Sequence, residues 1–415
     1  MKSPAASVTV NGRTYAWPDR PLVVVCIDGN APDYFDRAVA AGAMPYLAGA
    51  RTRGASLVSD CVIPSFTNPN NLSIVTGVPP AVHGICGNYF LDPDTGTEVM
   101  MNDAKFLRAE TIFAAFQKKG AKIAVVTAKD KLRGLLGQGL SFAGGATICF
   151  SSEKADKTTT AENGIARADS FVGLPIPEVY SADLSRFIFE AGVKIMAAHR
   201  PDLMYLSTTD YIQHKHAPGT PEANAFYGMM DGYFAKLDAQ GATLALTADH
   251  GMNAKHRAAD KQPDVIYLQD MLDGWLGAGR ARVILPITDP YVVHHGALGS
   301  FAVLHLPPGA EDGVIARLKA MDGIEEALPK AAACLRFELP PDRMGDVIVV
   351  STAHKVLGTG VARHDLSALK EPLRSHGGVS EQEIPMVLNR PVRGLDPRRR
   401  LRNFDVFDVA LNHIA

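Results

Sequence analysis

The chain has 415 residues with a formal net charge of −2 at pH 7, and 47% of its residues are hydrophobic and 21% charged. This balance is ordinary for a soluble globular protein, and the length suffices for two domains or for one large domain with an insertion. Because there is no long basic run and no apolar stretch that could span a bilayer, we expect neither nucleic acid nor a membrane as a partner.

The start of the chain contains no apolar core of the kind that a signal peptide needs. The stretch V-T-V-N-G-R-T-Y at 8–15 predicts instead a small hairpin that turns at Asn11 and Gly12. The 5 cysteines are scattered and odd in number, without a C-x-x-C pair, which speaks against a cysteine zinc site. They favour a reducing compartment, so we expect a cytoplasmic location.

Short β-branched runs bounded by turn residues alternate with helical patterns along most of the chain. Strands are predicted at 21–27, 122–127, 146–150, 203–207 and 243–247. Helices are predicted at 44–52, 69–76, 110–118, 181–197 and 223–237. This alternation predicts an α/β fold, with a mostly parallel sheet and helices on both of its faces.

The pattern changes after residue 255, where short strands gather around one helix. Strands are predicted at 283–285, 300–306, 332–338 and 346–351, with a helix at 312–321. We interpret 259–365 as a small inserted α+β cap domain that forms a lid, and 1–258 with 366–415 as the catalytic core. His294 and His295 fall in the insert, where a loop role is favoured over lining the lid.

The stretch I-P-S-F-T-N-P-N-N-L-S-I-V-T-G at 63–77 opens as a helix does. Asn68 is suited to cap it and Pro69 to its first position, because the N–H that proline lacks would be unpaired there. Thr67 would then stand just outside a helix start, where backbone N–H groups and the helix dipole favour negative charge. It is either an ordinary residue at a helix start or a nucleophile, with Ser65 as the rival nucleophile.

Acidic residues follow three of the predicted strands at their carboxyl ends, where chemistry collects in open parallel sheets. They are Asp28, Asp210 and Asp249, the last followed directly by His250. Each alone could be a turn residue or a helix cap, but three carboxylates at one rim would repel unless a cation lies between them. His214, one helical turn after Asp210, and His376 would add nitrogen ligands. Mixed carboxylate and imidazole donors suit zinc, with manganese or iron as competitors.

Five motifs, in this order, resemble the alkaline phosphatase superfamily: I-D-G at 27–29, P-S-F-T-N-P-N at 64–70, D-Y-I-Q-H at 210–214, A-D-H-G-M at 248–252 and S-H-G-G at 375–378. The stretch 64–90 is similar to the nucleotide pyrophosphatase/phosphodiesterase branch in particular. One departure is Gln213, which stands where relatives usually show glycine. The resemblance implies an alkaline phosphatase-like core with two zinc ions. One ion would be held by Asp28, Thr67, Asp249 and His250, and the other by Asp210, His214 and His376.

The resemblance also implies which residues contact the substrate. Asn88 would donate to a phosphoryl oxygen. Lys129 and Lys131, which follow the strand at 122–127 and point the same way if the segment is extended, would bind a carboxylate. Thr67, His214 and His376 would complete the substrate site.

The implied activity is that of a hydrolase that cleaves the P–C bond of phosphonoacetate to acetate and phosphate, through attack by Thr67 and a phosphothreonine intermediate. The main alternative is a phosphodiesterase or nucleotide pyrophosphatase that uses the same two-metal site. A phosphomutase and a non-enzymatic metal-binding relative fit the sequence less well. The expected partner is a small phosphonate, and assembly as a homodimer stays open.

Overall fold

A seven-stranded sheet forms the centre of the chain in this computed structural model, which describes residues 7–288, 296–367 and 369–415. In spatial order its strands are β4 (Ala55–Asp60), β19 (Glu383–Leu388), β10 (Thr243–Thr247), β3 (Leu22–Cys26), β9 (Leu203–Ser207), β7 (Ile123–Thr127) and β8 (Thr147–Ser151). All of them run in one direction except β19, which is antiparallel to both of its neighbours. The mostly parallel sheet predicted from the sequence is confirmed.

Two strands of this sheet, β4 and β19, were not predicted. β19 contains Pro385, and proline is a signal against a strand inside a sheet. β4 lies at the edge of the sheet and alternates half-buried with exposed residues over its first four positions, so it lacks the continuous apolar run of the central strands.

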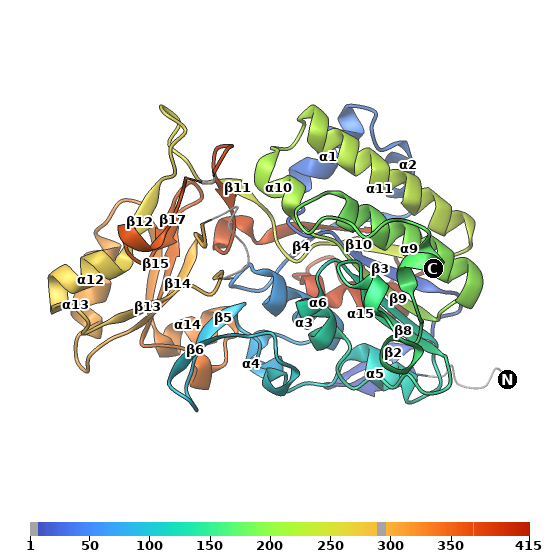
Figure 1. The fold of residues 1–415 in the computed structure, drawn as a ribbon, viewed down its shortest axis with the longest axis horizontal. Coiled ribbons are helices and arrows are strands. Elements are labelled where there is room, and N and C mark those ends of the chain that lie inside the picture. Colours follow the sequence, from blue (N-terminus) through green and yellow to red (C-terminus); the bar gives the residue numbers. More distant parts are fainter. Residues whose placement is uncertain (1–6, 289–295, 368) are drawn as a thin grey trace.

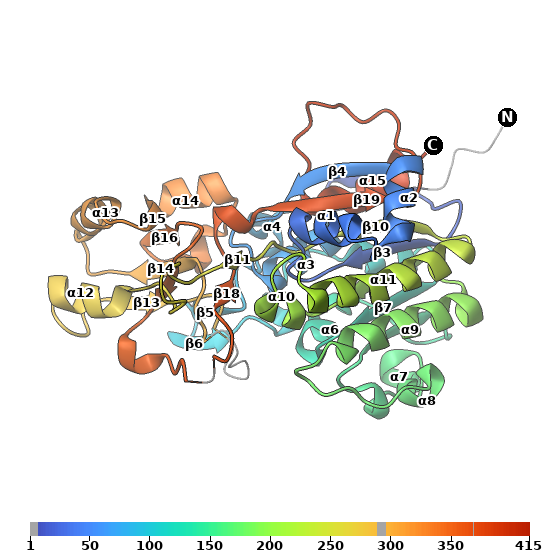
Figure 2. The same cartoon turned by 90° about the horizontal axis from the view of Figure 1, so that it is seen from above.

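Helices cover both faces of the sheet (Figures 1 and 2). One face carries α1 (Pro32–Ala40), α2 (Pro45–Arg53), α9 (Asp183–His199) and α11 (Pro221–Ala239). The other carries α3 (Thr67–Thr76), α5 (Ile112–Gln117), α6 (Asp130–Leu136) and α15 (Val406–Asn412). Successive strand residues alternate between the two cores, since Val23 and Val25 of β3 pack with the first set of helices and Leu22 and Val24 with the second. The predicted α/β architecture is therefore confirmed.

The start of α3 differs from the prediction. The helix begins at Thr67, and the residue before it, Phe66, is extended and offers no side-chain cap. Asn68 is therefore not the cap, and its side chain donates instead to the carbonyl of Met101. The backbone N–H of Asn68 is satisfied by Oδ1 of Asn88, at 3.1 Å, so the capping group comes from a loop 20 residues away.

A second, four-stranded antiparallel sheet lies to one side of the first (Figure 1). Its order is β13 (Arg282–Ile284), β14 (Phe301–His305), β16 (Val347–Ser351) and β15 (Ile324–Pro329), and the helices α12 (Leu268–Leu276), α13 (Glu311–Lys319) and α14 (Lys330–Phe337) belong to the same stretch of chain. The strand predicted at 332–338 is wrong, because this segment is α14. Its run of alanines favours a helix, but the prediction gave more weight to the apolar residues of the segment, whose pattern suggested a strand. The helix α12 and the strand β15 were missed.

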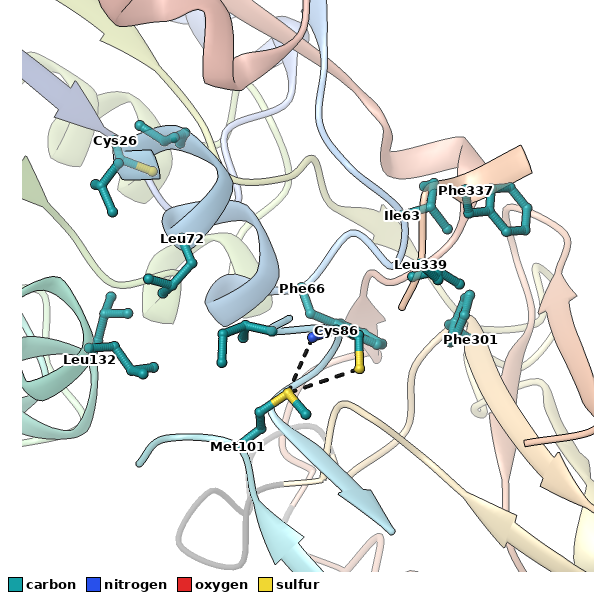
Figure 3. Packing of buried hydrophobic residues seen from close by; sticks show 14 of the residues in the cluster. Cys26, Ile63, Phe66, Leu72, Cys86, Met101, Leu132, Phe301, Phe337 and Leu339 are labelled. Carbon is teal, nitrogen blue, oxygen red and sulfur yellow. Dashed lines mark hydrogen bonds between the residues drawn. The ribbon is translucent and has the colours of Figure 1, made fainter. Parts of the chain in front are cut away.

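The two sheets are joined by a continuous apolar packing. Phe66, just before α3, lies edge to face against Phe301 of β14 with ring centroids 6.4 Å apart, and both side chains are fully buried (Figure 3). The sulfur of Met101 accepts from the backbone N–H of Cys86 at 3.2 Å beside them (Figure 3).

The hairpin predicted at 8–15 is confirmed, with Asn11 and Gly12 as its two-residue turn.

Within the described residues, no helix combines the length and the apolar character needed to cross a membrane. His294 and His295 lie outside the described residues.

Candidate active site with two metal-ligand clusters

The predicted ligands gather at the carboxyl ends of β3, β9 and β10, in two groups. The first group is Asp28, Asp249 and His250, and the second is Asp210, His214 and His376. Within each group, one potential ligand atom from every residue lies within 4.8 Å of the others. All of these residues are buried, as expected of groups that hold an ion rather than face water.

The first cluster contains two buried atoms that lack a hydrogen-bond partner among the described residues. Nε2 of His250 lies 3.2 Å from Oδ1 of Asp28, and within the described residues neither atom has a hydrogen-bond partner. Nδ1 of His250 donates to the carbonyl of Gly251 at 2.9 Å, which directs Nε2 into the cluster. Burial, Asp210 and Asp249 raise the pKa of Asp28 well above its ordinary value. Burial alone would lower the pKa of His250, but Asp249 and Asp28 outweigh it and raise the pKa to about 10.

The second cluster is arranged around one carboxylate oxygen. Oδ2 of Asp210 lies 2.9 Å from Nε2 of His214 and 3.7 Å from Nε2 of His376. Nδ1 of His214 donates to the carbonyl of Arg374 at 2.8 Å, and Nδ1 of His376 donates to that of Ser65 at 2.7 Å. Both rings therefore present Nε2 to the same point, which is the orientation of metal-binding histidines.

The two clusters adjoin each other. The rings of His250 and His376 are stacked, with centroids 3.6 Å apart and planes 7° from parallel. Burial, His250 and His214 lower the pKa of His376 well below its ordinary value, so this ring is neutral and its Nε2 is free to coordinate. The arrangement can hold two cations side by side, which is the geometry that clamps a reacting phosphoryl group.

Thr67 and Ser65 are clearly distinguished by the structure. Thr67, the first residue of α3, lines a cavity of about 590 Å³, a volume that includes open solvent, next to Asp28 and Asp210. Ser65 is fully buried, and its hydroxyl donates to the carbonyl of Gly378 at 2.9 Å and accepts from the N–H of Gly377 at 3.0 Å. The Ser65 hydroxyl is thus committed to holding the loop of His376, and Thr67 is the better-placed nucleophile.

The same cavity brings together the predicted substrate-contacting residues. The sequence-predicted residues that line it are Asp28, Thr67, Asn88, Lys129, Lys131, Asp210, His214 and His376. Asp249 and His250 do not line it, since both are fully buried. The cavity walls also include residues that were not predicted to belong to the site, namely Asn68, Thr127, Ala128, Leu132, Thr208, Thr209 and Ile287.

Lys129 and Lys131 reach the cavity by a different route from the extended segment that was expected. Lys129 is the extended residue that precedes α6, and Lys131 lies in the first turn of that helix. Burial and the neighbouring ammonium of Lys129 lower the pKa of Lys131 to about 8. Asp210 interacts electrostatically with both lysines, so the two ammonium groups face the carboxylates of the site.

Two buried polar residues close to the motifs, His83 and Gln213, do not line the cavity. His83 is buried, its Nδ1 accepts from the N–H of Ile85, and burial lowers its pKa to about 3, so it is a neutral structural histidine. Gln213 is buried and donates to the hydroxyl of Tyr227 at 3.1 Å, and it does not line the cavity. Gln213 therefore packs behind the second cluster and makes no contact with the cavity.

Two polar residues around the first cluster were missed. Nδ2 of Asn71 donates to Oδ2 of Asp249 at 3.1 Å, and Oγ1 of Thr208 accepts from the N–H of Asp28 at 2.9 Å. Asn71 lies one helical turn after Thr67, so its spacing could have placed it on the same face of α3. Thr208 follows β9 directly, and its position beyond a strand end was the available signal.

A two-cluster site of this kind, at the carboxyl ends of a parallel sheet and beside a threonine at a helix start, defines a class of metal-dependent enzymes acting on phosphorus. The family model described as type I phosphodiesterase / nucleotide pyrophosphatase matches residues 22–378, and the chain belongs to this family. A phosphonoacetate hydrolase from Sinorhizobium meliloti 1021, solved in complex with phosphonoacetate, is 61% identical over 100% of both chains, with a TM-score of 0.96. The same hydrolase has also been solved in complex with phosphonoformate.

More distant relatives show the fold and local similarity. Murine ectonucleotide pyrophosphatase/phosphodiesterase 5 is 19% identical, covers 94% of this chain and 93% of its own, and has a TM-score of 0.61. An ectonucleotide pyrophosphatase/phosphodiesterase of Caenorhabditis elegans is 32% identical over 111 residues, which are 24% of this chain and 13% of that protein. The chain thus matches only a small part of the length of this curated relative, whereas it matches the whole of the S. meliloti hydrolase.

Proposed function

We propose that this protein hydrolyses phosphonoacetate to acetate and phosphate, with Thr67 as the nucleophile. The observation that carries the proposal is the shared cavity: Lys129 and Lys131 line the same hollow as Thr67 and the second ligand cluster. A phosphonate group seated between Thr67 and the clusters would place a carboxylate one carbon away within reach of these cations. The full-length similarity to a phosphonoacetate hydrolase supports this assignment.

The ligand groups fit two zinc ions. The orphaned pair of Asp28 Oδ1 and His250 Nε2, and the mixture of imidazole and carboxylate donors, match zinc, with Mn²⁺ or Fe²⁺ as substitutes. Asp28, Asp249, His250 and Thr67 would hold one ion, and Asp210, His214 and His376 the other. When bound, the ions supply charge stabilisation for the phosphoryl oxygens and lower the pKa of a nearby hydroxyl or water.

Thr67 and the two lysines would act at different points of the reaction. The Thr67 hydroxyl gives up its proton to solvent, and its Oγ1 attacks phosphorus. The P–O bond forms as the P–C bond breaks, and the electron pair of the P–C bond passes into the departing acetate, which leaves as an enediolate. Lys129 and Lys131 stabilise that growing negative charge more than they stabilise the bound substrate, which lowers the barrier. The enediolate takes a proton from solvent to give acetate, and water then hydrolyses the phosphothreonine to release phosphate.

Other residues position the phosphonate. Oδ1 of Asn88 accepts from the N–H of Asn68, which leaves the amide nitrogen to donate to a phosphoryl oxygen. Ile287, from the segment 259–365, also lines the cavity, and we propose that this segment is a lid that excludes large substrates and water. The cysteines are all buried free thiols, which fits a cytoplasmic location.

A phosphodiesterase with the same metal site is the second candidate, since the family is named for that activity. A nucleotide substrate would need a flat surface on which the base can stack. Among the described residues that line the cavity there is no Phe, Tyr or Trp, so the structure favours the smaller substrate.

The test measures phosphate release by zinc-loaded protein from phosphonoacetate, phosphonopyruvate and 2-aminoethylphosphonate, beside cleavage of a nitrophenyl phosphodiester. We expect release from phosphonoacetate to be fastest and to be lost in Thr67→Ala. We expect Lys129→Ala to lower kcat/KM for phosphonoacetate by about 10–100-fold, the size of one charged hydrogen bond. Brisk diester cleavage without phosphate release from phosphonoacetate would move the protein to the phosphodiesterase candidate.

A further inference from the structure

Arg374 is a buried arginine that contacts the segments of His214 and His250 and lies on the segment of His376. It begins β18 (Arg374–Ser375), which pairs with β11 (Asn253–Ala254), and it is only 8% exposed. Its Nε donates to the carbonyl of Gln213 at 2.8 Å, and Nη2 donates to the carbonyl of Met252 at 3.3 Å. These carbonyls belong to the residue before His214 and to the segment that follows His250.

The contact with His214 is reciprocal. The carbonyl of Arg374 accepts from Nδ1 of His214 at 2.8 Å, while its guanidinium holds the backbone of the preceding residue. His376 lies two residues further along the same strand segment, so one residue links two ligands of the second cluster. The first cluster is contacted only through the carbonyl of Met252.

Within the described part of the chain, the guanidinium of Arg374 forms no ion pair within 4.0 Å. The third hydrogen bond of its side chain goes to the hydroxyl of Tyr34 at 3.2 Å. Burial raises the pKa of this tyrosine to about 12, so the hydroxyl is neutral and does not balance the guanidinium charge. A buried cation without a carboxylate is costly and needs a reason to be retained.

We propose that Arg374 is a positioning residue that assembles the second metal-binding cluster, by fixing His214 and His376 relative to each other. This inference rests on the metal centre of the proposed function, but not on the identity of the substrate. Positioning and simple electrostatics predict opposite changes in metal affinity when Arg374 is removed. Removing a positive charge near a metal site should tighten metal binding by electrostatics alone, whereas removing a positioning group should weaken it.

The test titrates metal-free protein with Co²⁺, followed by its visible absorption, and counts bound zinc after dialysis. Wild type should take up two ions. In Arg374→Met, one ion should bind as in wild type and the second about 10–100-fold more weakly, as is typical when a group behind a ligand is removed. Arg374→Lys, which keeps the charge but not the forked donor, should also weaken the second ion, since the position and not the charge is at stake.

Arg343→Met is the matched control. Nη1 of Arg343 also donates to two backbone carbonyls, those of Gly84 and Phe106 at 2.5 and 2.7 Å, but it contacts none of the ligand-bearing segments. This variant should keep both ions. Should Arg374→Met fail to fold by circular dichroism, Arg374→Gln and Arg374→Lys retain a donor and carry the same test.

Equal or tighter binding of both ions in the folded Arg374 variants would overturn the inference while leaving the proposed function intact. If wild type itself takes up no second ion, the metal centre of the proposed function fails, and this inference fails with it. Weakening of both ions to the same degree would also contradict it, because it would show a general loss of structure rather than selective positioning.

Discussion

The two ligand clusters face each other across the stacked rings of His250 and His376, yet the fold assembles them in different ways. Cys26 of β3 is paired in register with Thr247 of β10, so Asp28 and Asp249 stand at equivalent positions two residues beyond a paired point of the sheet. The first cluster is thus set by the sheet itself. The second combines Asp210, a short helix and a segment near the end of the chain, and it depends on contacts between distant segments.

This difference implies that the second cluster is the more easily disturbed. Of the first cluster only Asp28 lines the cavity, while Asp249 and His250 are fully buried, whereas all three residues of the second cluster, Asp210, His214 and His376, line the cavity. The two clusters therefore differ in their access from the cavity and in their dependence on contacts between distant segments. Each of the following predictions changes one of the clusters or its surroundings.

The largest effect is expected at Thr67, which lines the cavity beside Asp28 and which we propose as the nucleophile. Thr67→Ala should lower phosphate release from phosphonoacetate by at least about 10⁴-fold, because loss of a nucleophile removes the covalent route. Zinc content, measured by mass spectrometry, should stay near two ions, since every other ligand remains. Ser65→Ala should keep far more activity than Thr67→Ala, and the reverse order would make Ser65 the nucleophile.

The next effect concerns the buried ion pair beneath the loop of His376. Nζ of Lys255 lies 2.8 Å from Oε1 of Glu381, and Oε2 of Glu381 accepts from the N–H of Gly378 at 2.9 Å. Burial alone would raise the pKa of Glu381, but Lys255 outweighs it and lowers that pKa. Lys255→Met leaves the carboxylate buried without its partner and should lower the free energy of unfolding by about 3–5 kcal/mol in urea denaturation.

The matched double variant Lys255→Met/Glu381→Gln separates charge from packing. It should recover much of the lost stability, because no uncompensated charge is left in the interior. A change below about 1 kcal/mol in the single variant would mean that water reaches the pair, and the second cluster would then be better supported than we infer.

The sequence reveals ligands that directly follow a strand more readily than contacts between distant segments. The residues of the first cluster were found because a buried strand and the carboxylate just beyond it are adjacent in the chain, as in V-C-I-D-G and T-A-D-H-G. In the second cluster, Asp210 was found by the same rule and His214 by its spacing of one helical turn, whereas His376 follows no predicted strand and Arg374 was missed. Its partners Gln213 and Met252 are 161 and 122 residues away, and no local pattern reports such contacts.

The errors in the fold have the same origin. The start of α3 was misplaced because its capping group, Asn88, comes from another loop, whereas capping rules read only the neighbouring residues. In the segment of α14, the weak apolar pattern was given more weight than the helix preference of its alanines. Periodicity identified the long buried elements, and short elements at the surface of the second sheet escaped it.

Chelation should sharpen the comparison of the two sites. When zinc-loaded protein is mixed with excess chelator, we expect one ion to leave at least about tenfold faster than the other, because the second cluster opens to the cavity and relies on supporting groups. His376→Asn should abolish the fast phase and keep the slow one. If His250→Asn removed the fast phase instead, the first cluster would be the labile site.

The smallest effect is a pH dependence at Lys131, whose pKa is lowered to about 8 by burial and by Lys129. Asp210 and Asp28, one carboxylate from each cluster, partly oppose this shift. Below this pKa the side chain is an ammonium and attracts the substrate carboxylate, and above it the charge is lost. The kcat/KM for phosphonoacetate, which reports the free enzyme, should therefore fall by up to about tenfold between pH 7 and 9. Lys131→Arg keeps its charge throughout, so its profile should be flatter over this range. The same fall in Lys131→Arg would assign the titration to another group.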